Sequence, residues 1–228
     1  MFASAPVAMT QFGNNKNPSR GILRPTLQMN SMSSPATPRP TNAIVLSWDD
    51  FLCPVEWLQR NIPPTSTTHS CLLQLDQCIV QLLLHASTIG PVFVLCESGA
   101  SFIEGLCTAY LPGCAQLFSS PQHQARIQLI CAATTLTSAW HGQILKMICT
   151  QRLPVSASYG LVTVGGDGLR EGCLALAKYA PAVLPKVLRV VKTTDLSGGM
   201  PAILHRLVGV GRQLGGLVQH GSAVDLSI

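Results

Sequence analysis

Short apolar runs alternate with helical patterns from Ala43 onward, and this alternation constrains the fold more than any other feature. The runs and the patterns lie, in chain order, at residues 43–48, 70–85, 91–96, 101–110, 127–132, 136–149, 159–164, 169–179, 187–191 and 200–218. Runs that are apolar throughout are typical of strands buried on both faces of a sheet. Short connections between alternating strands and helices favour parallel pairing. The sequence therefore predicts a Rossmann-like three-layer α/β sandwich with a mostly parallel sheet.

The N-terminal segment does not share this pattern. Residues 1–41 are rich in Pro, Ser, Asn, Thr and Met and show neither a helical nor a strand period. Such a segment cannot bury enough apolar surface to offset the entropy lost on ordering. We predict a disordered tail at residues 1–41 and one α/β domain at residues 42–228 with little or no cap domain. Residues 54–68, which contain Pro63-Pro64, are predicted to form a loop.

Composition argues against two classes of partner. Charged residues make up 11% of the chain, against roughly 25% in typical domains. The net charge of +5 comes in part from four basic residues of the acid-free tail. Aromatic residues are 5% of the chain and do not interleave with a basic stripe, so nucleic-acid binding is not expected. No apolar stretch approaches the ~20 residues that span a bilayer, so no membrane span is predicted.

The nine cysteines indicate a reducing compartment. None forms a Cys-x-x-Cys pair, and several lie inside apolar runs, as Cys96 and Cys131 do. We therefore predict reduced, mostly buried thiols in a cytoplasmic protein. The acid-free, arginine-containing tail partly resembles a mitochondrial transit peptide, which keeps a mitochondrial location as the alternative.

The first strand leads into the segment with the clearest functional signal. The apolar run Ile44–Leu46 is followed by Ser47, Trp48 and two adjacent carboxylates, Asp49 and Asp50. In open α/β sheets, ligands bind at the carboxyl ends of the strands. The position of these carboxylates therefore predicts a site at that edge. A simpler interpretation, in which they only form a turn or a helix cap, stays open.

This segment resembles the first motif of the haloacid dehalogenase-like (HAD) hydrolases, Asp-x-Asp-x-Thr/Val after a hydrophobic strand. Ser47 stands at the first aspartate of that motif and Asp49 at the second. The resemblance extends over residues 43–228, because later segments resemble the other motifs in the same order. They are Val92–Cys96 for the second motif, Trp140-His141 for the region of the third-motif lysine, and Val162–Asp167 for the fourth.

The resemblance implies a role for each matching position. In family members the first aspartate attacks phosphorus and the second is the general acid and base. Magnesium is held by the first aspartate, by a main-chain carbonyl of the second and by the fourth-motif aspartate. The implied positions are catalytic Ser47, Asp49 and His141, phosphate-binding Cys96 and Glu97, and metal-binding Asp49 and Asp167.

Four of the expected chemical groups are changed. Ser47 stands at the nucleophile position, and a serine hydroxyl is a weak nucleophile unless a base lies beside it. Cys96, a poor hydrogen-bonding group, replaces a hydroxyl. His141 replaces the lysine, and Phe51 replaces the threonine of the first motif. Loss of a nucleophile alone costs roughly 10⁴–10⁶ in rate. We therefore predict a degenerate, catalytically impaired HAD-like protein that binds or regulates, with a phosphorylated small molecule or a protein as partner and with weak or no Mg²⁺ binding.

Other interpretations of the same residues stay open, including whether the chain is an enzyme. One is an active Mg²⁺-dependent phosphatase with altered motifs. Another is a hydrolase that uses Ser47, His141 and Asp167, although no Gly-x-Ser-x-Gly elbow is present. The segment Gly165–Gly168 also resembles the Gly-Gly-Asp-Gly motif of NAD and diacylglycerol kinases, with Leu169 where those families have threonine. Cys96 and His141 are also typical of buried core residues.

Overall fold

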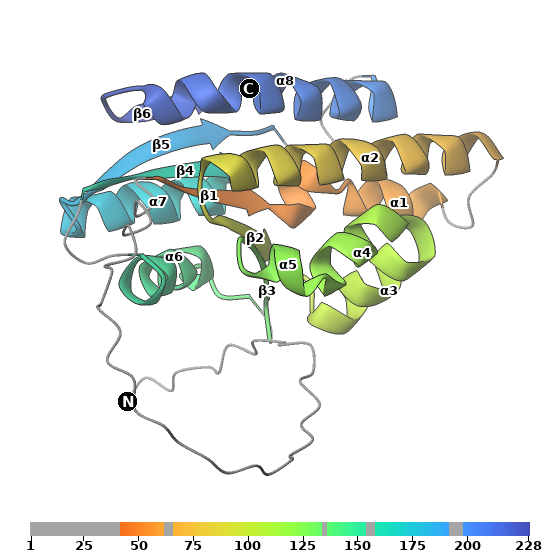
Figure 1. Cartoon of the computed structure of the whole chain (residues 1–228), viewed down its shortest axis with the longest axis horizontal. Coiled ribbons are helices and arrows are strands. Elements are labelled where there is room, and N and C mark those ends of the chain that lie inside the picture. The colour runs from red at the N-terminus through yellow and green to blue at the C-terminus, as the bar shows by residue number, and fades with distance from the viewer. Residues whose placement is uncertain (1–41, 62–65, 134–135, 154–157, 192–197) are drawn as a thin grey trace, which may run out of the picture.

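Six parallel strands lie side by side in the part of the chain that the structure describes (Figure 1). The structure is a computed structural model; it describes residues 42–61, 66–133, 136–153, 158–191 and 198–228, and the predicted tail at residues 1–41 lies outside these ranges. The strands are β1 (Asn42–Ser47), β2 (Val92–Cys96), β3 (Ile127–Cys131), β4 (Tyr159–Gly165), β5 (Val183–Arg189) and β6 (Val224–Ser227). Their order is β3-β2-β1-β4-β5-β6, and each neighbouring pair is parallel. The predicted α/β class is confirmed.

Helices cover both faces of this sheet and complete the three-layer sandwich (Figure 1). The longer helices are α2 (Ser66–Ile89), α3 (Ala100–Tyr110), α4 (Pro112–Ser119), α6 (Trp140–Gln151), α7 (Asp167–Tyr179) and α8 (Gly199–Gln219), and the short ones are α1 (Val55–Asn61) and α5 (Pro121–Gln124). One core cluster joins one face of the sheet to α1, α2, α3, α4 and α8, and a second cluster joins the other face to α6 and α7. Because helices cover both faces of the sheet, the side chains on both sides of each central strand are buried and mostly apolar.

Helix α2 follows from the spacing of its apolar residues. Leu72, Leu75, Ile79 and Leu83 recur at helical intervals and are almost completely buried. The helix lies beside α8 over the same face of the sheet (Figure 1). Its buried apolar stripe therefore packs in the core between the sheet and α8.

Several predicted boundaries need correction. The predicted loop at residues 54–68 was wrong in its described parts, since α1 and the first residues of α2 occupy them, and residues 62–65 lie outside the described ranges. The helix predicted to begin at residue 136 begins at Trp140. The Gly-rich turn is shorter than predicted, because α7 already begins at Asp167.

The C-terminal end of the sheet also differs from the prediction. The strand predicted at residues 187–191 is β5, which begins at Val183, and β6 follows α8 as a further strand. Pro185 explains why the start of β5 was missed, because proline cannot donate to a strand ladder and is confined to edges. The pairing of β5 with β6 starts one residue later, at Lys186↔Val224. Pro185 therefore comes before the part of β5 that pairs with β6.

A buried lysine joins β5 to the end of α8. Lys186 is 2% exposed, and its Nζ donates a hydrogen bond to the carbonyl of Val218 in the last turn of α8. The last carbonyls of a helix have no partner within the helix, and they carry partial negative charge. Burial lowers the pKa of Lys186. Lys186 therefore acts as a C-terminal cap for α8.

Helix α8 is unusually rich in glycine, and packing does not require it. A Cβ built on Gly209, Gly215 or Gly216 would meet no atom within 4 Å, and at Gly211 it would make an ordinary contact of 3.5 Å with Leu82. The helix nevertheless buries an apolar stripe that includes Ile203, Leu207, Val210 and Leu214. Tertiary contacts through this stripe therefore hold α8 in place.

Candidate functional site

The site lies at the carboxyl edge of the sheet, near the point where the strand order reverses. The strands that follow β1 along the chain run outward as β2 and β3 on one side, while β4 and β5 lie on the other side. In doubly wound sheets this reversal opens a crevice between the loops of the two halves. Here it separates the loop after β1 from the loop after β4.

A π-helical turn holds the first motif at this edge. The turn η1 spans Trp48–Leu52, and the N–H of Cys53 donates to the carbonyl of Trp48 at 2.8 Å. Trp48, Phe51 and Leu52 are fully buried and anchor the turn in the core. Phe51, at the threonine position of the motif, therefore fills the core.

Asp49 joins the end of β1 to the loop after β2. One carboxylate oxygen accepts a hydrogen bond from the N–H of Glu97 at 2.7 Å, and the other accepts one from the hydroxyl of Ser98 at 3.1 Å. The thiol of Cys96 also lies within hydrogen-bonding reach. Burial raises the pKa of Asp49, and these hydrogen bonds offset part of the rise. Both oxygens of Asp49 are thus engaged within the protein.

Ser47 is enclosed beside β4. Its side chain is 1% exposed. A Cβ built on Gly165 would lie 2.8 Å from the Cβ of Ser47 and 2.8 Å from Leu169, so only glycine fits at that position. The residue at the nucleophile position therefore sits in a tightly packed contact between β1 and the start of α7.

His141 connects the loop after β2 to the start of α7. Its Nε2 lies 3.3 Å from a carboxylate oxygen of Glu97, and its ring packs edge-on against Trp140 with centroids 4.9 Å apart. A Cβ built on Gly168 would come within 2.8 Å of the His141 Nδ1. Glycine at position 168 therefore allows the imidazole to approach the first turn of α7.

Asp167 faces the end of β5. Its carboxylate forms a two-pronged ion pair with the guanidinium of Arg189, in which one of the two contacts measures 3.1 Å. Beside it, Arg170 pairs in the same way with Asp225 of β6, at 2.9 and 2.5 Å. The guanidinium of Arg170 lowers the pKa of Asp225. Charges of opposite sign thus offset one another at the start of α7.

Two cysteines end neighbouring strands at the same edge. Cys96 and Cys131 are Cα partners in the β2–β3 register. Interaction with the Cys131 thiol, together with burial, raises the pKa of Cys96, and the same interaction lowers the pKa of Cys131. Cys96 is fully buried, so its thiol is not presented to solvent as a phosphate ligand would be.

The predicted residues thus fall into two connected groups. Asp49, Cys96, Glu97 and His141 form one chain of contacts that ends against the first turn of α7. Asp167 lies in that turn and pairs with Arg189. Among the described residues, no three His, Cys, Asp or Glu side chains gather as a metal site would require.

Sequence reasoning missed three partners in this site. Ser98, Cys131 and Arg189 each stand at or just after the end of a strand. Their position at strand ends was the available signal, because parallel strands bring their carboxyl ends to one edge. Which of them would face Asp49, Cys96 or Asp167 depends on strand order, which the sequence did not give.

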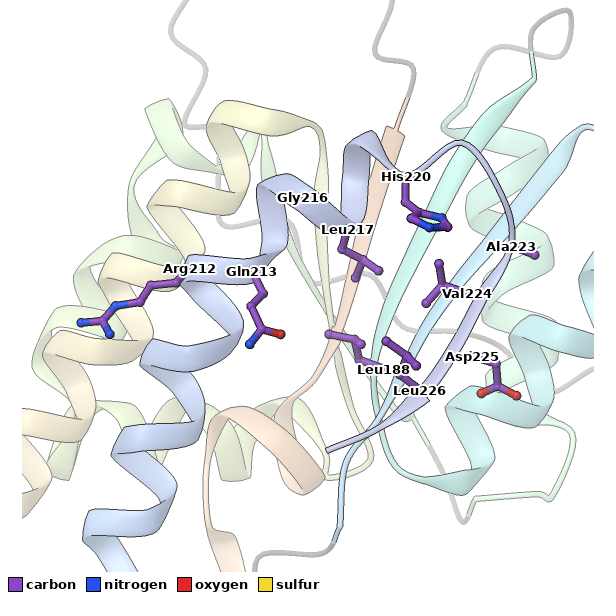
Figure 2. A pocket seen from close by; sticks show the side chains of 10 residues that line it. All are labelled: Leu188, Arg212, Gln213, Gly216, Leu217, His220, Ala223, Val224, Asp225 and Leu226. Atoms are coloured by element: carbon purple, nitrogen blue, oxygen red, sulfur yellow. The ribbon is translucent and has the colours of Figure 1, made fainter.

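A separate pocket lies between the end of α8 and the last two strands (Figure 2). Its volume is about 600 Å³, and its apolar part includes Leu188, Leu217, Val224 and Leu226. Arg212, Gln213 and His220 add polar groups from the α8 side. None of the residues predicted for the carboxyl-edge site lines it.

One helix meets the length and composition of a membrane span. It is the part of α2 at Thr68–Ile89, in the region of the chain that the structure describes. Its apolar stripe is packed in the core cluster with the sheet and α8. A core helix passes the same test as a membrane span, so this match is weak evidence for a span.

Comparisons of this chain with protein-family models, with curated proteins and with solved structures find no match. The assignment of function therefore depends on the chemistry of the carboxyl-edge site.

Proposed function

We propose that this chain is a degenerate HAD-like protein that acts as a binding or regulatory module and has lost phosphatase catalysis. The observation that carries the proposal is the engagement of its two motif carboxylates. Asp49 accepts hydrogen bonds from the loop after β2, and Asp167 is paired with Arg189. The part-buried bonds of Asp49 hold the loop after β2, and the guanidinium of Arg189 neutralises Asp167, whereas an active phosphatase would direct both carboxylates at a metal ion and a phosphoryl group.

The nucleophile position supports the same conclusion. Ser47 is 1% exposed and lies against Gly165. Attack on phosphorus requires a nucleophile that can reach the substrate in line with the leaving group. A buried hydroxyl in a packed contact is poorly suited to that step.

The contacts of His141 weigh against the Ser/His/Asp hydrolase alternative. In such a triad the histidine takes the proton of the serine while the aspartate orients the histidine. The Nε2 of His141 lies 3.3 Å from the carboxylate of Glu97, and Asp167 is paired with Arg189, so both groups are directed at partners other than the ones that a triad requires. The active phosphatase with altered motifs is the main competing function.

Hydrolysis of p-nitrophenyl phosphate by the full-length protein with magnesium distinguishes these functions. We expect wild-type turnover to equal that of Asp167→Asn, because Asp167 has no catalytic task in a binding module. Asp225→Asn is the matched control, since Asp225 also pairs with an arginine, Arg170 of α7, but lies outside the motifs. Wild-type turnover that falls tenfold or more in Asp167→Asn and not in Asp225→Asn would contradict the proposal.

Thermal melting separates the two classes of ligand. A ligand that binds only the folded state raises the melting temperature. A rise with a phosphorylated compound from a panel of small phosphate esters identifies that class as the partner. Melting that no member of the panel changes favours a protein partner.

A further inference from the structure

Cys96 and Cys131 are placed as a disulfide would require. They are Cα partners in the β2–β3 register, and both side chains belong to the core cluster on the α2 face of the sheet. Adjacent strands lie ~4.7–4.9 Å apart, which is inside the 4.4–6.8 Å range of Cα separations in disulfides. Both side chains therefore lie on the same face of the sheet, next to one another.

The other cysteines do not share this arrangement. Seven of the nine lie on helices or just after η1, and only Cys96 and Cys131 are on strands. The pair also ends its strands, where the next backbone bond runs from the N–H of Ala132 to the carbonyl of Cys96 at 2.9 Å. Strand ends adjust more easily than strand centres, and Cys131 is 7% exposed while Cys96 is fully buried. Of these two thiols, Cys131 is therefore the one that a small oxidant reaches first.

We propose that Cys96 and Cys131 form a reversible disulfide, which makes the ends of β2 and β3 a site of oxidative modification. The oxidant is a peroxide. The sulfur of Cys131 attacks one oxygen of hydrogen peroxide, the O–O bond breaks, and a sulfenic acid and one water result. The sulfur of Cys96 then displaces the hydroxyl of the sulfenic acid, which leaves as a second water with the thiol proton. Two thiols and one peroxide thus give one disulfide and two waters, and a dithiol reductant reverses the change.

The modification acts on the candidate site directly. The reduced Cys96 thiol lies near Asp49 and contributes to lowering the pKa of that carboxyl, and a disulfide has no S–H proton with which to do so. The new bond also closes the segment between the two cysteines, which carries Glu97, Ser98 and helices α3, α4 and α5. Oxidation therefore changes the hydrogen bonding of Asp49 and fixes the loop that holds it. This inference concerns thiol chemistry and holds whether or not the chain hydrolyses phosphate esters.

The test uses the full-length wild-type protein, so it does not depend on a variant that folds. The protein is treated with hydrogen peroxide, quenched, denatured and alkylated, and its free thiols are counted and mapped by mass spectrometry. We expect two of the nine thiols to be lost, a peptide link between Cys96 and Cys131, and recovery of all nine with dithiothreitol. In Cys96→Ser we expect Cys131 to stop at the sulfenic acid, which dimedone traps.

Cys107→Ser is the matched control, because Cys107 is equally buried in the same core cluster and should leave the link intact. Nine thiols that survive a peroxide dose sufficient to consume free glutathione would overturn the proposal. A link between any other pair of cysteines in the wild-type protein, or oxidation of Cys131 beyond the sulfenic acid without a link, would overturn it as well.

Discussion

Replacement of Asp76 by alanine should remove a large share of the stability of the α/β domain. Asp76 lies on α2 and is 5% exposed. Its carboxyl oxygens accept hydrogen bonds from the N–H groups of Gly113 at 2.6 Å and Cys114 at 2.8 Å, in the first turn of α4. The first N–H groups of a helix have no acceptor within the helix, so Asp76 caps α4 from a neighbouring helix.

The size of the effect follows from the two donors left behind. The N–H of Cys114 is buried and that of Gly113 is part-buried. A buried donor without an acceptor costs about 1–3 kcal/mol, so Asp76→Ala should lower the free energy of unfolding by about 2–4 kcal/mol. The whole free energy of unfolding of a domain is about 5–15 kcal/mol. Asp76→Asn keeps one acceptor oxygen and should cost about half as much. Gly113 is required for this approach, because a Cβ there would lie 2.8 Å from the Asp76 carboxyl oxygen.

Urea unfolding followed by circular dichroism measures this loss. With a denaturant slope of about 2 kcal/mol per M, the midpoint of Asp76→Ala should fall by about 1–2 M. Asp225→Ala serves as the control, because it removes a carboxylate from a solvent-exposed ion pair with Arg170 and such pairs contribute little. A midpoint for Asp76→Ala no lower than that of Asp225→Ala would refute the capping argument.

Three further predictions test the site and the tail. Ser47→Asp should raise the affinity for Mg²⁺ by more than about tenfold in a calorimetric titration, since it restores a carboxylate at the implied metal position; an unchanged affinity means that Ser47 is not at that position. Deletion of residues 1–41 should leave the melting temperature nearly unchanged, and a large drop would show that the tail is packed. Burial raises the pKa of Asp49 above its usual 3.8. Between pH 3.8 and the raised pKa, the folded state therefore binds more protons than the unfolded state. The stability of the wild type relative to Asp49→Asn should therefore increase as pH falls through this window, and a decrease in urea midpoint there would contradict the burial argument.

Apolar periodicity was sufficient to predict the layers of the fold, because buried strands and amphipathic helices have distinct patterns. It failed where a local rule and a tertiary contact disagree. Pro185 argues against a strand, yet it lies in β5 just before the pairing with β6 begins. The strand β6 is four residues long, too short for its alternation to stand out from the helix before it.

The candidate site was predictable in position and less so in its contacts. Asp49 was assigned to the carboxyl edge because it follows an apolar run, and Asp167 was implied by the resemblance to the fourth motif; the structure places them after β1 and β4. Two contacts depend on which strands become neighbours. They are the hydrogen bond that Asp49 accepts from the loop after β2 and the ion pair of Asp167 with Arg189. Strand order results from packing over the whole sheet, which no local pattern encodes.

The glycines of α8 affect how readily this helix unfolds locally. Each glycine inside a helix costs roughly 0.5–1 kcal/mol relative to alanine, and α8 carries Gly209, Gly211, Gly215 and Gly216 in its interior. Because packing does not require them, they lower the helix propensity of α8 without any compensating contact. We therefore expect the backbone amides of α8 to exchange with solvent through local opening, at a lower free energy than those of β1 and β4. Strand β6, which follows α8 and pairs only with β5 among the described strands, should open together with it.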